Sequence, residues 1–153
     1  MMQVDRIDLK ILKILQIDGK VSNAELAKRI NLSPSPCLAR VKRLEQQGLI
    51  KQYVALLDPK TAGLELNVFV FITLKTQSRA LLKEFEERIS AHPAVMECYL
   101  MTGVEDYMIR VVMPNVASLE RFIVDDLSPM PEIEHIRSSI ALKQVRYKTA
   151  LPL

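Results

Sequence analysis

The sequence predicts an α+β protein of two domains, and three observations support this. The first 57 residues contain three helical patterns and carry a net charge of +5, from ten Lys and Arg and five Asp and Glu. The rest of the chain alternates between strand and helix patterns and carries a net charge of −2. Between them, a stretch with Pro59 and Gly63 is typical of a linker. We therefore expect an N-terminal domain over residues 1–57, a linker over residues 58–65 and a C-terminal domain over residues 66–153.

Composition narrows the class of protein. The chain has 153 residues, of which 49% are apolar and 25% charged, which is typical of a globular protein rather than a disordered one. No stretch approaches the ~18 apolar residues of a membrane helix, and the N-terminus lacks a signal-peptide pattern, so we expect a cytoplasmic protein with no membrane partner. Cys37 and Cys98 form no disulfide framework, and His92 and His135 lack metal-ligand spacing. The cysteines are expected to be reduced thiols that fill core or interface space, and no metal or cofactor is expected.

Apolar periodicity and capping residues predict the first two helices. The first helix, over residues 5–16, has one apolar stripe. This stripe consists of Ile7, Ile11, Ile14 and Leu15. The second helix is expected to begin at Ser22, because Glu25 follows three residues later and completes a capping box. It is expected to stop at Asn31.

The third helix begins with two prolines. Ser33 is the predicted N-cap, and Pro34 and Pro36 lie in the first turn, where backbone N–H groups have no helical partner. The residues expected to face the core are Leu38, Val41 and Leu44. The residues expected on the other sides are Ser35, Arg40, Lys42 and Arg43. Gly48 is expected to end the helix, and residues 49–57 are expected to be extended, as in a winged helix-turn-helix domain.

Two short helices joined by a tight turn, with basic residues on the second, are typical of a helix-turn-helix that binds double-stranded DNA. Arginine can pair with guanine and serine can bond to several bases, whereas lysines suit phosphates. The predicted DNA-binding residues are Lys28, Arg29, Ser33, Ser35, Pro36, Arg40, Lys42, Arg43 and Lys51. Charge and periodicity alone leave open a solvated basic helix in a small bundle.

The C-terminal domain is predicted to be a ferredoxin-like βαββαβ fold. Strands are expected over residues 66–76, 95–102, 107–113 and 136–147, and helices over residues 78–90 and 116–127. The first strand has apolar residues on both faces, with Val68 and Val70 on one and Phe69 and Phe71 on the other. The domain's own helices can cover one face, so we expect the other to form a homodimer.

The C-terminal domain shows no recognisable catalytic motif, and its fold alone does not decide the function. No Gly-rich phosphate loop or metal cluster is found, so we expect no enzyme. The nearest thing to a site is the hairpin over residues 102–107, which from sequence alone can also be a simple polar turn.

The order and spacing of residues along nearly the whole chain resemble the Lrp/AsnC family of transcription regulators. The segments that carry the resemblance lie at residues 5–8, 23–27, 32–48 and 53–59. The resemblance implies that the hairpin binds a small effector, usually an amino acid, between the C-terminal domains of neighbouring dimers. It also implies assembly of dimers into higher homo-oligomers, commonly octamers.

The resemblance further assigns the effector-binding residues. They are Thr102, Gly103, Val104, Glu105, Asp106 and Tyr107, with Ser138, Ser139 and Ile140 from the facing subunit. Backbone N–H groups at a glycine turn can hold an α-carboxylate, and Asp106 can pair with an α-ammonium group. Val104 stands where members of the family often have an acid.

Three functions are therefore considered. The leading hypothesis is a sequence-specific, amino-acid-responsive transcription regulator. The second is an effector-independent, nucleoid-structuring DNA-binding protein, which predicts long and weakly specific footprints. The third is a ferredoxin-like enzyme fused to a basic helical module, for which only Glu105 and Asp106 are candidate acid–base residues.

Overall fold

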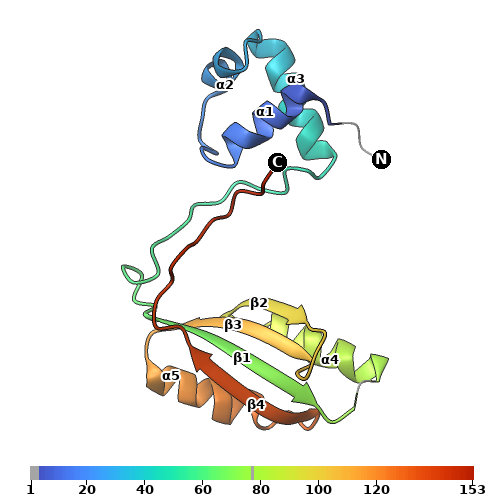
Figure 1. Cartoon of the computed structure of the whole chain (residues 1–153), viewed down its shortest axis with the longest axis vertical. Helices are drawn as coiled ribbons and strands as arrows, with labels where there is room; N and C mark the ends of the chain where they lie inside the picture. Colours follow the sequence, from blue (N-terminus) through green and yellow to red (C-terminus); the bar gives the residue numbers. More distant parts are fainter. Residues whose placement is uncertain (1–3, 77) are drawn as a thin grey trace. The chain divides into compact units, whose positions relative to one another are not determined.

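A computed structural model describes residues 4–76 and 78–153 and divides them into two compact units (Figure 1). The helical unit contains residues 4–56 together with Arg146–Leu153, and the sheet unit is Leu57–Val145. The last eight residues thus group with the helical unit, whereas the sequence placed them in the C-terminal domain. In the described part of the chain, no helix is long and apolar enough to cross a membrane.

The helical unit has the three expected helices. They are α1 (Arg6–Leu15), α2 (Asn23–Arg29) and α3 (Pro34–Gln46). Its core consists of Ile11, Leu12, Leu26, Ala27, Ile30, Cys37 and Leu44. Two capping boxes were possible. At α1, Asp5 and Asp8 form a complete one; at α2, Ser22 accepts the N–H of Glu25, whose own side chain bonds Arg29 instead.

The buried face of α3 differs from the expected one by one position. Cys37 is fully buried, whereas Leu38, which was expected in the core, is 42% exposed. Cys37, Val41 and Leu44 are spaced four and three residues apart and so share one helix face. The expected face used Leu38 in place of Cys37, because it assumed a constant spacing of three residues. Ser33 is the N-cap, but its side chain makes no capping bond.

The chain turns away from α3 at Gly48, whose φ of 74° is easily adopted only by a residue without a Cβ. The N–H of Leu49 then bonds the carbonyl of Leu44, which closes the helix end. The following segment over residues 51–58 contains neither helix nor β-bridge, so the residues expected to be extended form no strand of a sheet in this unit.

The sheet unit confirms the βαββαβ order. Its elements are β1 (Leu66–Leu74), α4 (Arg79–Ser90), β2 (Val95–Leu100), β3 (Tyr107–Met113), α5 (Val116–Arg121), the π-helical turn η1 (Phe122–Leu127) and β4 (Ile133–Ile140). The strands pair antiparallel in the order β2-β3-β1-β4. The last strand was expected over residues 136–147 but ends at Ile140, since its partner β1 has almost run out there: Ile140 pairs with Val68.

The two faces of the sheet differ, as the first strand predicts. Val68, Val70, Ile72 and Leu74 are buried against Phe85 of α4 and against residues of α5 and η1, so the helices cover this one face. Phe69, Phe71 and Thr73 alternate with them and are only half-buried. The other face is therefore open and apolar.

Candidate DNA-binding surface and effector loop

The exposed side of α3 is a continuous stripe opposite the core. It consists of Ser35, Ala39, Lys42 and Gln46, all exposed. These residues are spaced four, three and four positions apart and therefore lie along one line on the helix. Leu38 and Pro36, both exposed, border this stripe near the start of the helix. The stripe presents small side chains, a hydroxyl and a cation, which suits close approach to DNA.

The turn between α2 and α3 has a defined geometry. Asn31 adopts a positive φ of 57°, and the N–H of Leu32 bonds the carbonyl of Ala27 at 2.9 Å. The side-chain amide of Asn23 donates to the carbonyl of Pro34 at 2.8 Å, which joins the first turns of the two helices. These bonds fix the start of α3 relative to α2.

Other predicted DNA contacts also lie on the surface. Lys28, Arg29, Ser33 and Lys51 are exposed. Arg29 is 3.0 Å from Glu25 on the same helix and 3.9 Å from Asp18, in pairs that are about half exposed. Such exposed pairs are weak, so the guanidinium can exchange its partner for a phosphate at little cost.

Arg40 and Arg43 lie in an ion cluster with Asp5 and Asp8, which the residue pattern did not predict. One nitrogen of Arg40 is 2.6 Å from Asp5 and 2.8 Å from Asp8, and Arg43 is 2.5 Å from Asp8. The side chain of Asp8 is only 1% exposed, and it also accepts the N–H of Asp5. The cluster therefore connects the first turn of α1 to the middle of α3.

The cluster also changes the titration of Asp5 and Arg40. The N–H of Asp8, and then the Arg40 guanidinium, lower the pKa of Asp5 to about 2, and the carboxylates of Asp5 and Asp8 raise the pKa of Arg40. Both shifts favour the charged forms. A signal was available in the sequence, because two acids three residues apart at a helix start can form a capping box.

The effector loop connects β2 and β3. Gly103 has a φ of 144° with no atom within 4 Å of an added Cβ, and Val104 is 88% exposed. Asp106 is buried, and its carboxylate accepts the N–H of Leu74 at 2.7 Å. The N–H of Asp106 bonds the carbonyl of Ile72 in β1, and the N–H of Met101 bonds the carbonyl of Asp106, which closes the base of the loop. Asp106 therefore has a role inside the fold.

Tyr107, which was expected at the effector site, has its side chain in the core. Its ring is 1% exposed and packs 4.7 Å from the ring of Phe85. Its hydroxyl donates to Glu86 at 2.7 Å, and burial together with this carboxylate raises the pKa of Tyr107. The phenol thus belongs to the contact between the sheet and α4.

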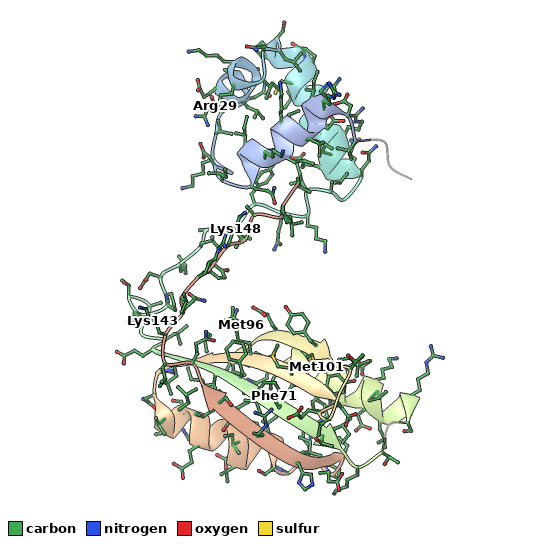
Figure 2. The ribbon with its side chains drawn as sticks, in the orientation of Figure 1. Arg29, Phe71, Met96, Met101, Lys143 and Lys148 are labelled. Atoms are coloured by element: carbon green, nitrogen blue, oxygen red, sulfur yellow. The ribbon has the colours of Figure 1, made fainter. Side chains whose placement is uncertain are left out.

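A charged cluster joins the loop to the open face of the sheet. Arg137 of β4 donates to Glu105 at 2.5 Å, and its guanidinium carbon lies 4.1 Å from the ring centre of Phe71 (Figure 2 labels Phe71). The bond with Arg137 lowers the pKa of Glu105. The residue pattern pointed to Glu105 but not to its neighbours Arg137 and Phe71, because only the register of β1 and β4 places Arg137 beside Phe71.

The three predicted closing residues of β4 do not share one face. Ser139 pairs with Phe69, so it lies on the open face. Ser138 and Ile140 pair with Val70 and Val68 and therefore lie on the opposite side. All three are exposed, since β4 is an edge strand.

Comparisons with known proteins agree with both units. The Lrp/AsnC ligand binding domain matches residues 67–151, and a winged helix-turn-helix DNA-binding family matches residues 4–51. The Bkd operon transcriptional regulator of Pseudomonas aeruginosa is 43% identical over the whole length of both chains.

Solved structures extend this similarity. A Neisseria meningitidis transcriptional regulator in complex with L-Met has a TM-score of 0.94 and 34% identity, with 98% of this chain and 97% of that chain covered. An AsnC family regulator from Agrobacterium tumefaciens has a TM-score of 0.92 and 41% identity, with 97% and 96% covered. The similarity therefore spans the helical unit, the sheet unit and the chain that joins them.

Proposed function

Because this chain belongs to the Lrp/AsnC family and is a DNA-binding transcription regulator of that type, not an enzyme, we propose which of its surfaces bind DNA and effector. The stripe of α3 from Ser35 to Lys42 enters the major groove. The observation that carries this proposal is the exposure of that stripe directly opposite the core of the helical unit.

Within this surface the predicted residues take different roles. Ser35 and Leu38 lie near the start of α3, where a recognition helix contacts base edges, and can reach a base edge and a thymine methyl group. The predicted phosphate contacts are Lys28, Arg29, Lys42 and Lys51. Arg40 positions α3 on α1 through its carboxylate partners instead of reading a base.

Replacing Lys42 by alanine is expected to weaken binding to all DNA sequences alike. A lost phosphate contact removes affinity without changing specificity, and it lowers the slope of log Kd against log salt by about 1. Fluorescence anisotropy with DNA from upstream of the protein's own gene, at several salt concentrations, measures both. Lys60→Ala, outside the helical unit, is the matched control. Wild-type protein that shows no salt-dependent binding would contradict the proposed function.

The loop over residues 102–106 is proposed to bind an amino acid with an apolar side chain. Backbone N–H groups at Gly103 suit the α-carboxylate, and Glu105 offers a carboxylate for the α-ammonium group. The neighbouring open face presents Phe71, and Met101 is 41% exposed beside the loop (Figure 2). The L-Met complex of the Neisseria meningitidis protein supports an effector of this class.

A thermal-shift screen against the twenty amino acids is expected to single out apolar ones such as methionine or leucine. An effector at 100 times its Kd stabilises the protein by about 2.7 kcal/mol. Gly103→Ala is expected to abolish the shift. Gly63→Ala is the matched control, because Gly63 also has a positive φ and open space but lies outside the loop. If none of the twenty amino acids shifts the melting temperature, the result would favour the alternative of an effector-independent DNA-binding protein.

We propose that the protein acts as a homodimer formed through the open face, and that dimers assemble further, up to an octamer. The half-buried Phe69 and Phe71 support this, since the described helices leave that face uncovered. Two helical units then bind half-sites about one helical turn apart, or a multiple of it. An effector between dimers would shift their assembly, and its proposed place of action is the cytoplasm.

A further inference from the structure

The end of the chain is held by a specific contact on the helical unit. The N–H of Leu151 donates to the side-chain oxygen of Gln16 at 2.5 Å, and the side-chain nitrogen of Gln16 is 3.4 Å from the carbonyl of Leu151. One glutamine, at the C-cap of α1, thus bonds both main-chain groups of one residue, as a neighbouring β-strand would. The C-terminus accordingly lies beside α1 in Figure 1.

The side chains of this segment follow the same pattern. Thr149, Leu151 and Leu153 all line hollows of the helical unit, whereas the residues between them do not. The N–H of Leu153 bonds the carbonyl of Leu151 at 3.0 Å, so the last three residues form a tight turn. Leu151 and Leu153 line one of about 220 Å³. Its apolar walls include Leu12, Leu15, Leu49, Ile50 and Tyr53. Thr149 lines the adjoining hollow of about 570 Å³, beside Ile17 and Tyr53.

We infer that the groove between the end of α1 and residues 49–53 is a docking site for the chain's own C-terminal segment, Arg146–Leu153. Two features support this occupant: the paired bonds to Gln16, and the alternation of the residues that line the groove. Leu151 remains 67% exposed and Leu153 45% exposed. The segment is therefore shallowly seated, and its docking is reversible.

Docking gives the helical unit a second connection to the sheet unit. The sheet unit runs from Leu57 to Val145, so chain that belongs to the helical unit both precedes and follows it. With the tail released, one linker alone carries the helical unit, and its orientation is freer. A dimer that binds two half-sites must then lose more orientational freedom on binding. The docked segment therefore favours binding to paired half-sites.

Hydrogen exchange of the full-length protein tests the docking itself. In the wild type the Leu151 amide is expected to be protected, and Gln16→Leu, which removes both bonds but keeps an apolar side chain of similar size, is expected to raise its exchange to the rate of a free peptide. Gln52→Leu, at another glutamine of the same groove, is the matched control and is expected to keep the protection. An unprotected Leu151 in the wild type, or one unaffected by Gln16→Leu, would overturn the inference.

DNA binding tests the consequence, which rests on the proposed function. Gln16→Leu and a chain that ends at Ala150 are both expected to bind DNA with two half-sites three- to tenfold more weakly, and DNA with one half-site as the wild type does. Equal loss on both DNAs, or no loss on either, would overturn the coupling. Wild-type protein that binds neither DNA would contradict the proposed function alone, because the exchange experiment does not depend on DNA.

Discussion

Replacing Asp8 by alanine is expected to destabilise the helical unit by about 3 kcal/mol. Removing one partner of a buried ion pair costs about 3–5 kcal/mol, and the partial exposure of the two arginines here places the cost at the lower end. Asp8 is almost fully buried and bonds Arg40, Arg43 and the N–H of Asp5. Its loss removes these bonds, leaves Arg40 with Asp5 alone and removes half of the α1 capping box.

Urea unfolding followed by circular dichroism at 222 nm measures this effect. In thermal unfolding, about 3 kcal/mol corresponds to a fall in Tm of roughly 12–24 °C for a unit of this size. Glu25→Ala is the control, because it breaks only the exposed pair with Arg29 and is expected to cost less than about 0.5 kcal/mol. Equal stability of the two variants would show that the Asp8 cluster does not hold α3 on α1.

Replacing Phe71 by lysine is expected to convert the proposed dimer into monomers and to weaken binding to paired half-sites by about 100-fold or more. The substitution places a new cation beside Arg137 in the centre of the open face, where the partner's face would bury both. Linked binding sites gain about 10²–10⁴ in affinity over single ones, and monomers lose that gain. Light scattering and fluorescence anisotropy measure the two effects.

The control for this substitution adds the same charge elsewhere on the sheet unit. Val124 is 56% exposed on η1, away from the open face, so Val124→Lys is expected to leave both mass and DNA affinity unchanged. Circular dichroism distinguishes a folded monomer from an unfolded variant. A Phe71→Lys protein that remains dimeric would place the dimer interface on another surface.

The sequence predicted the elements well where one face of an element is buried. The period of apolar residues in α1 and β1 led to the observed helix and to the observed alternation of the strand. It failed by one position in α3, where Cys37 and Leu38 are both apolar and only packing decides which is buried. It also failed at the end of β4, because the length of a strand depends on where its partner ends.

The candidate sites were likewise predictable from the sequence only in part. Local residue chemistry pointed to the stripe of α3 and to the loop at Gly103, because helix faces and glycine turns are encoded within a few residues. Contacts between distant residues could not be predicted: Asp8 with Arg40, Arg137 with Glu105, and Gln16 with Leu151 are 32, 32 and 135 residues apart. Such ion pairs and hydrogen bonds depend on the packing of whole elements.

The sequence by itself determined the two kinds of unit, their order and the basic charge of the first, since these follow from periodicity and composition. Only the tertiary structure decided which charged side chains are paired, which predicted site residues are buried and to which unit the C-terminal segment belongs. It turned two arginines expected at DNA toward the buried Asp8, moved Tyr107 into the core and returned the last eight residues to the helical unit. The physical reason is that burial and pairing are properties of neighbours in space, which a linear pattern does not contain.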